Sequence, residues 1–179
     1  MIDLSDLTNH SPLVILRGEY GIVKGENSLL ASPNAKNGII LILSSVENQM
    51  LVMAHFDDDD KIQANLEKIL NEMLQAAGSI KNIKCNLMGK EDEKAFEKKV
   101  KKFFEDQENQ IEVEVNHESW SGNHSYNILA AGSGEILIDN SSDLMRALIN
   151  RVLFMKNGEK RVTAAMNPEV ITDLALVSD

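Results

Sequence analysis

The sequence is poor in several residue types, and each shortage excludes a class of protein. Cys85 is the single cysteine among 179 residues, so an intramolecular disulfide and a cysteine cluster for zinc are both impossible. No apolar run approaches the roughly 18 residues that indicate a membrane span, and no apolar leader follows Met1. Basic residues number 18 against 28 acidic ones, a net charge of −10, whereas nucleic-acid binding depends on Lys and Arg at the phosphates. We therefore expect a cytoplasmic protein that binds neither membrane nor nucleic acid.

The most informative stretch is Asn37–Phe56, in which two apolar runs flank a short polar turn at Ser45–Gln49. Nearly every position of both runs is Val, Ile, Leu, Met or another apolar residue, whereas a strand with one solvated face would alternate. The pattern predicts a hairpin that is buried on both faces in the centre of a sheet. His55 lies at its open end.

Two amphipathic helices are predicted after the hairpin, over Lys61–Ala77 and Glu91–Asp106, because apolar residues recur there at helical spacing. Gly78 stands where a helix commonly ends. The four aspartates Asp57–Asp60 are interpreted as a cap that complements the positive end of the first helix. A cation site formed by these carboxylates with His55 is the alternative interpretation.

The remaining elements are short. Further strands are predicted at Leu13–Leu16, Tyr20–Val23, Asn82–Met88, Ile111–Val115, Tyr126–Ala130 and Glu135–Ile138. Two polar segments, Gly25–Gly38 and Asn116–Tyr126, are predicted as loops. Cys85 is interpreted as a small core residue, with a reactive thiol as the alternative. His117 and His124 match no zinc-binding spacing, and we predict neither a metal nor a cofactor.

At this length and with 43% hydrophobic residues, the chain is expected to form one domain with a substantial core. Residues 140–179 are predicted to be an extension packed on the domain of residues 1–139. Within the extension the pattern predicts a capped helix at Asn140–Met155, a strand at Arg161–Ala165 and a final short helix at Pro168–Val177.

Several motifs, taken in their order along the chain, resemble the CheD family of chemoreceptor glutamine deamidases over about Leu13–Ile138. Gly18-Glu19-Tyr20 is similar to the GEY sequence of that family, and Met53-Ala54-His55-Phe56 is similar to its MAHF-type segment. Gly122-Asn123-His124 resembles its GGN loop, and Gly134–Ile138 resembles its closing strand. The resemblance implies an α/β sandwich with a mixed β-sheet core and two main covering helices, to which this chain adds a helical C-terminal extension.

Members of that family are amidohydrolases in which a cysteine attacks a glutamine amide, a histidine moves the proton and a threonine supplies a hydroxyl. By this resemblance His55 holds the histidine position, Ser32 the threonine position and Gly38 the cysteine position. Pairing the hairpin about Glu47 predicts Gly38 or Ile39 opposite His55. Because glycine carries no nucleophile, we expect a catalytically degenerate member that binds a protein partner, such as a chemotaxis or signalling protein.

Two hypotheses of other classes stay open. One is an amidohydrolase or glutamine deamidase that uses His55 with a different nucleophile, such as Ser32, which requires the two side chains to lie within hydrogen-bond reach. The other is an unrelated α/β binding module. For the favoured hypothesis, the helix at Asp143–Met155 and the loop Asn116–Tyr126 are the expected contact surfaces.

Overall fold

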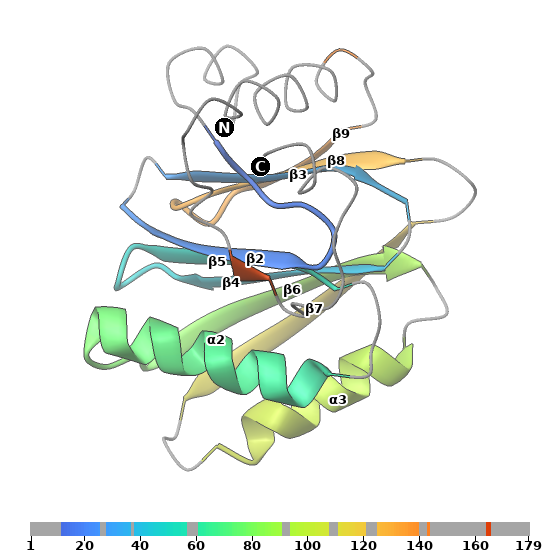
Figure 1. Ribbon diagram of the computed structural model, residues 1–179. Coiled ribbons are helices and arrows are strands. Elements are labelled where there is room, and N and C mark those ends of the chain that lie inside the picture. Colours follow the sequence, from blue (N-terminus) through green and yellow to red (C-terminus); the bar gives the residue numbers. More distant parts are fainter. Residues whose placement is uncertain are drawn as a thin grey trace.

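The computed structural model describes residues 12–25, 28–36, 38–56, 61–90, 94–107, 111–120 and 125–139, together with residues 143, 164 and 165. These residues form an α/β fold of three layers, in which two β-sheets stack face to face and two helices cover the outer face of the larger sheet (Figure 1). The prediction of an α/β fold with mixed sheets and two helices is confirmed. Neither described helix combines the length and the apolar character needed to cross a membrane.

The larger sheet holds six strands and the smaller sheet holds four. The larger has the order β10 (Ala164–Ala165), β2 (Glu19–Lys24), β5 (Met50–Phe56), β4 (Ile39–Ser45), β6 (Asn82–Lys90) and β7 (Glu112–Trp120). The smaller has the order β1 (Leu13–Val14), β3 (Leu29–Ala35), β8 (Tyr126–Ala131) and β9 (Ile136–Asp139). Both sheets are mixed, because β6–β7 and β1–β3 are parallel pairs among antiparallel neighbours.

The β4–β5 hairpin lies in the middle of the larger sheet, and every residue of both strands is buried. Alternate side chains point to opposite faces, so Leu41 and Leu43 join the core beneath the helices while Ile40 and Ile42 join the core between the two sheets. This explains the unbroken apolar runs and confirms the prediction of a central hairpin.

Helices α2 (Ile62–Ala77) and α3 (Lys94–Glu105) pack their apolar stripes on the outer face of the larger sheet (Figure 1). The predicted end at Gly78 is confirmed, since this residue adopts φ +80 and its N–H bonds to the Leu74 carbonyl. The N-cap is Lys61, without a side-chain cap bond. Asp57–Asp60, the interpreted cap, lie outside the described residues.

Two loop predictions are wrong. Within Gly25–Gly38 the chain forms β3, an inner strand of the smaller sheet, although its sequence LLASPNA carries Pro33. The strand tolerates proline because its pairing with β8 shifts register between Ser32 and Ala35, where a bulge interrupts the ladder. Likewise, β7 continues to Trp120 through polar residues predicted as loop, because each of them pairs with β6. In both cases tertiary pairing overrides local composition.

In the C-terminal extension, Ala164–Ala165 form β10 and pair with Tyr20 and Glu19 of β2, within the predicted strand Arg161–Ala165. The predicted helices at 140–155 and 168–177 lie outside the described residues, apart from Asp143. His124 and the GGN-like loop also lie outside them.

Candidate functional site

The candidate site lies between the two sheets, where a serine of β3 meets the histidine of β5. Ser32 Oγ lies 3.1 Å from His55 Nδ1 in a buried hydrogen bond. The Ser32 side chain has no exposed surface and His55 is only 3% exposed. His55 has the same parity along β5 as Leu51 and Met53, so its ring points into the core between the sheets. The structure therefore brings together the two side chains that the sequence singled out.

Regular alternation along β3 accounts for the position of Ser32. Ser32 pairs with Ile128 of β8 in the same register as Leu30 with Ala130, and the register shifts only after Ser32. Ser32 therefore has the same parity as Leu30, which lies in the core between the two sheets. The alternation places a short hydroxyl side chain against the imidazole from the facing sheet.

Gly38 lies on the other side of the imidazole, just before β4. Its backbone has φ +82, and a Cβ built there would lie 3.5 Å from His55 Nε2 but only 2.1 Å from the Phe56 carbonyl oxygen. Real Cβ atoms do not approach an oxygen so closely. The position assigned to the family's cysteine thus faces the ring nitrogen that Ser32 does not contact, yet the local backbone has no room for a side chain.

The predicted register of the hairpin is wrong by one residue if Ile39 is taken as the partner of His55, and by two if Gly38 is. His55 is opposite Ile40, and Ile39 is opposite Phe56, whereas the sequence reasoning placed Gly38 or Ile39 across from His55. The cause is a four-residue turn between Ser45 and Met50, which moves the centre of the hairpin away from Glu47. Gly38 therefore lies just outside the paired residues of β4 and β5. It is close to His55 because it lies beside Phe56, the last residue of β5.

The strand end that carries His55 is held by the turn before β2, a contribution that the sequence reasoning missed. Gly18 adopts φ +81 and donates its N–H to the His55 carbonyl at 2.8 Å. Glu19, which is 7% exposed, accepts a 2.9 Å bond from the Leu16 N–H. Tyr20 donates its hydroxyl proton to Glu72 of α2 at 2.7 Å. In the sequence, the Gly18-Glu19-Tyr20 motif was the feature that could have indicated this contribution, because each of its three residues makes a separate structural contact.

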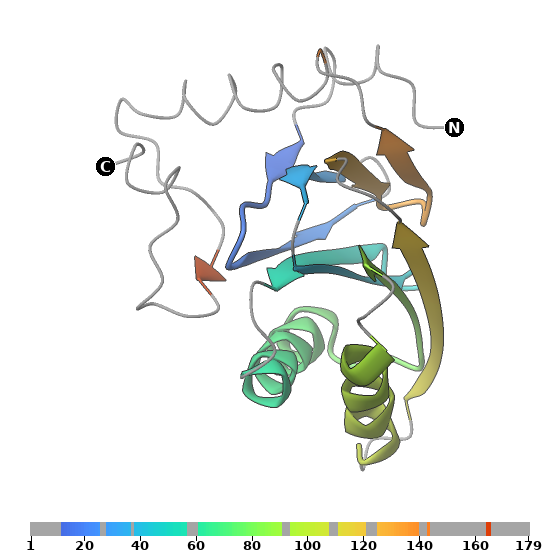
Figure 2. The same cartoon turned by 90° about the vertical axis from the view of Figure 1, so that its right-hand side faces the viewer.

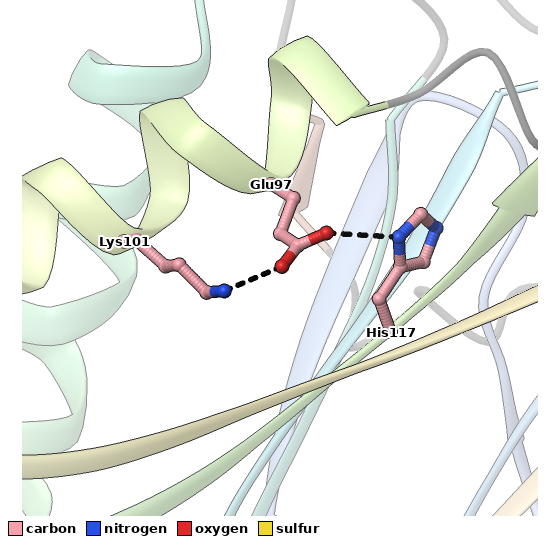
Figure 3. A network of polar contacts seen from close by, with 3 residues as sticks. All are labelled: Glu97, Lys101 and His117. Atoms are coloured by element: carbon pink, nitrogen blue, oxygen red, sulfur yellow. Dashed lines mark hydrogen bonds and ion pairs between the residues drawn. The ribbon is translucent and has the colours of Figure 1, made fainter.

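The other candidates of the sequence lie elsewhere. Cys85 is fully buried in the core beneath the helices, where burial raises the pKa of its thiol to about 12. His117 is in β7 and contacts Glu97 of α3, which also pairs with Lys101 (Figure 3). Within the described part of the chain, no three His, Cys, Asp or Glu side chains gather as a metal site would require.

The chemistry open to the Ser32–His55 pair is limited by burial. A serine next to an imidazole has the first requirement of an activated nucleophile. However, hollows of about 720, 400 and 290 Å³ on the surface are lined by other described residues, and none of those linings includes Ser32, Gly38 or His55. None of these three hollows therefore gives a substrate access to the serine–histidine contact.

Comparison with known proteins leaves the family open. No protein-family model matches the chain, and no curated protein matches it.

Proposed function

We propose that this chain is a catalytically degenerate relative of the CheD deamidases that acts by binding a protein partner. The proposal includes a CheD-like sandwich, a helical extension over residues 140–179 and a place in cytoplasmic chemotaxis or another signalling system. The observation that most directly supports the proposal is the conformation of the backbone at Gly38. A nucleophile at that position would face His55 Nε2, but its Cβ would lie 2.1 Å from the Phe56 carbonyl oxygen.

A structural role for the Ser32–His55 pair is consistent with this function. The pair joins the two sheets through a buried hydrogen bond, and the His55 carbonyl is bonded to Gly18. A buried polar group without a partner costs about 1–3 kcal/mol. The contact gives Ser32 and the Nδ1 atom of His55 a hydrogen-bond partner in a mainly apolar layer, and this role requires no substrate.

The proposal is tested by measuring ammonia release from glutamine-containing peptides. We expect no release above the buffer blank for the wild-type chain, for His55→Ala or for Gly38→Cys. The Gly38→Cys variant is the sharper test, because it supplies the family's nucleophile in a backbone that cannot accept it. Ammonia release by the wild type that His55→Ala abolishes would refute the proposal.

A second candidate function is an amidohydrolase that uses Ser32, and the 3.1 Å contact with His55 Nδ1 favours it. A fluorophosphonate probe, which labels activated serines, separates the two functions. The non-catalytic function predicts no label at Ser32 of the native chain, by peptide mass spectrometry. Labelling at Ser32 that disappears in His55→Ala, but persists in a control such as Ser44→Ala, would establish the hydrolase instead.

A further inference from the structure

The two sheets differ in width, and among the described residues no strand of the smaller sheet lies over part of the larger sheet. The smaller sheet ends at β9, whereas the larger sheet continues to β7. Figure 2 shows these two edge strands, coloured orange and olive, on the same side of the molecule. A hollow of about 400 Å³ lies between them, with Asn116 and Glu118 of β7 on one side and Ile136 and Ile138 of β9 on the other.

The uncovered face of β7 is acidic. Val113, Val115 and His117 are half-buried, while the alternate residues Glu112, Glu114, Asn116 and Glu118 are all exposed. A second hollow of about 720 Å³ is lined by Glu112, Glu114 and Glu47, and Lys84 lines both hollows. Of the described residues around the two hollows, Lys84 is the only cation. We call this surface, from Glu112 to Glu118 and across to Ile136 and Ile138, the β7–β9 groove.

The edge of β9 offers backbone groups to this groove. The Ala131 N–H bonds to the Glu135 carbonyl at 2.9 Å, and the ladder continues with Ala130 opposite Ile136 and Ile128 opposite Ile138. Antiparallel ladders alternate bonded and non-bonded pairs. The backbone N–H and C=O groups of Ile136 and Ile138 therefore point away from β8. A strand added at this edge would extend the smaller sheet over the uncovered face of β6 and β7.

We propose that the β7–β9 groove binds an extended, basic segment of a partner protein, which adds as a strand to β9. Lysine or arginine at alternate positions of that segment would lay its aliphatic stem along Ile136 and Ile138 and bring its charge to Glu114 and Glu118. The acidic side chains of the groove favour a basic segment as its occupant. A second copy of the chain would instead bring Glu135, which precedes its own β9, and Asp139, the last residue of that strand, toward an acidic surface. This inference rests on the proposed binding function and specifies its surface and its ligand chemistry.

The test is an amide chemical-shift titration of the isotopically labelled full chain with three synthetic peptides of about ten residues, a usual strand length or somewhat above. One peptide alternates Lys and Thr, one alternates Glu and Thr, and the third repeats the Lys–Thr sequence with alternate backbone nitrogens methylated. We expect the Lys–Thr peptide to shift the amides of Ile136, Ile138, Glu114 and Glu118. The acidic peptide should shift none of them, and methylation should weaken binding about tenfold, because it removes the donors that pair with an edge.

Two double variants supply the matched control. Glu114→Lys with Glu118→Lys reverses the charge of the groove, whereas Glu67→Lys with Glu105→Lys makes the same change in net charge on exposed positions of α2 and α3. The first pair should weaken binding of the Lys–Thr peptide about tenfold or more and the second much less, since exposed charges farther than a Debye length of about 10 Å are screened. Far-UV circular dichroism checks that both variants remain folded.

Shifts confined to β7 and β9, with the expected order of peptides and variants, support the inference. No shift with the Lys–Thr peptide, shifts centred on another surface, or dimerisation of the free chain through β9 would each overturn it. The proposed function is judged separately, by ammonia release. If the chain releases no ammonia and the Lys–Thr peptide shifts none of its amides, the inference about the groove is refuted, while the proposed binding function still stands.

Discussion

Replacing Gly38 by alanine tests whether the cysteine position of the candidate site is closed to side chains. An L-residue in the left-handed region costs about 1–2 kcal/mol. Gly38→Ala also forces a Cβ against the Phe56 carbonyl oxygen at 2.1 Å, and overpacking of that kind costs about 1–3 kcal/mol more. The expected loss is therefore about 2–5 kcal/mol in the free energy of unfolding.

Gly78→Ala is the comparison variant, because Gly78 also has a positive φ, +80 against +82 for Gly38, yet a Cβ at Gly78 would meet nothing within 4 Å. Its ψ is −48, so alanine there carries the conformational cost of a positive φ without a steric contact. It should therefore lose less stability than Gly38→Ala, which adds the contact with the Phe56 carbonyl oxygen. Urea unfolding followed by circular dichroism measures both. In a domain of this size 1 kcal/mol changes Tm by about 2–4 °C, so thermal melts provide a second measurement. Equal losses in the two variants would show that the chain around Gly38 accommodates a side chain, and the steric argument against a nucleophile there would fail.

Three further predictions follow from the pKa shifts. Because burial raises the pKa of the Cys85 thiol to about 12, iodoacetamide at about pH 8 should leave the native chain unmodified and alkylate it once urea unfolds it. Burial, and secondly the hydrogen bond to Glu72, raise the pKa of Tyr20 from its ordinary value of 10.0, so its stabilisation is complete below pH 10 and is lost above it. Wild-type stability should thus fall more steeply than that of Tyr20→Phe in alkaline urea titrations. The hydrogen bond from Lys101 lowers the pKa of Glu97 below its ordinary 4.5, so its stabilisation is present above that pH. The stability gap between wild type and Glu97→Gln should close in acid; a gap that widened in acid would contradict this sign.

The elements that local pattern determines were predictable from the sequence. The apolar runs of β4 and β5 and the helical spacing of α2 and α3 gave the correct elements, because each run encodes its own periodicity. The strand β3 was not predictable in this way. Its sequence LLASPNA has the composition of a loop, and it is a strand only because β1 and β8 pair with it from both sides. The division into two sheets depends on such long-range pairings and was missed for the same reason.

For the candidate site, the sequence identified the residues but not their packing. The motif order pointed to His55, Ser32 and Gly38, and the structure places a Ser32–His55 contact with Gly38 beside the second ring nitrogen. Two features lay beyond sequence reasoning. The register of the hairpin depends on a turn whose Gln49 adopts φ +50, and the closure of the Gly38 position depends on where the Phe56 carbonyl points.

These contacts bear on how a histidine at position 55 is to be interpreted. Its carbonyl accepts the Gly18 N–H, its ring bonds with Ser32 of the facing sheet, and β4 pairs along its strand. Each contact fixes the end of β5 whether or not the ring ever moves a proton. A histidine in a catalytic-looking motif is therefore weak evidence for catalysis in this chain. The backbone on its Nε2 side bears more directly on the family's mechanism, because a nucleophile at position 38 would require Gly38 to move away from the Phe56 carbonyl.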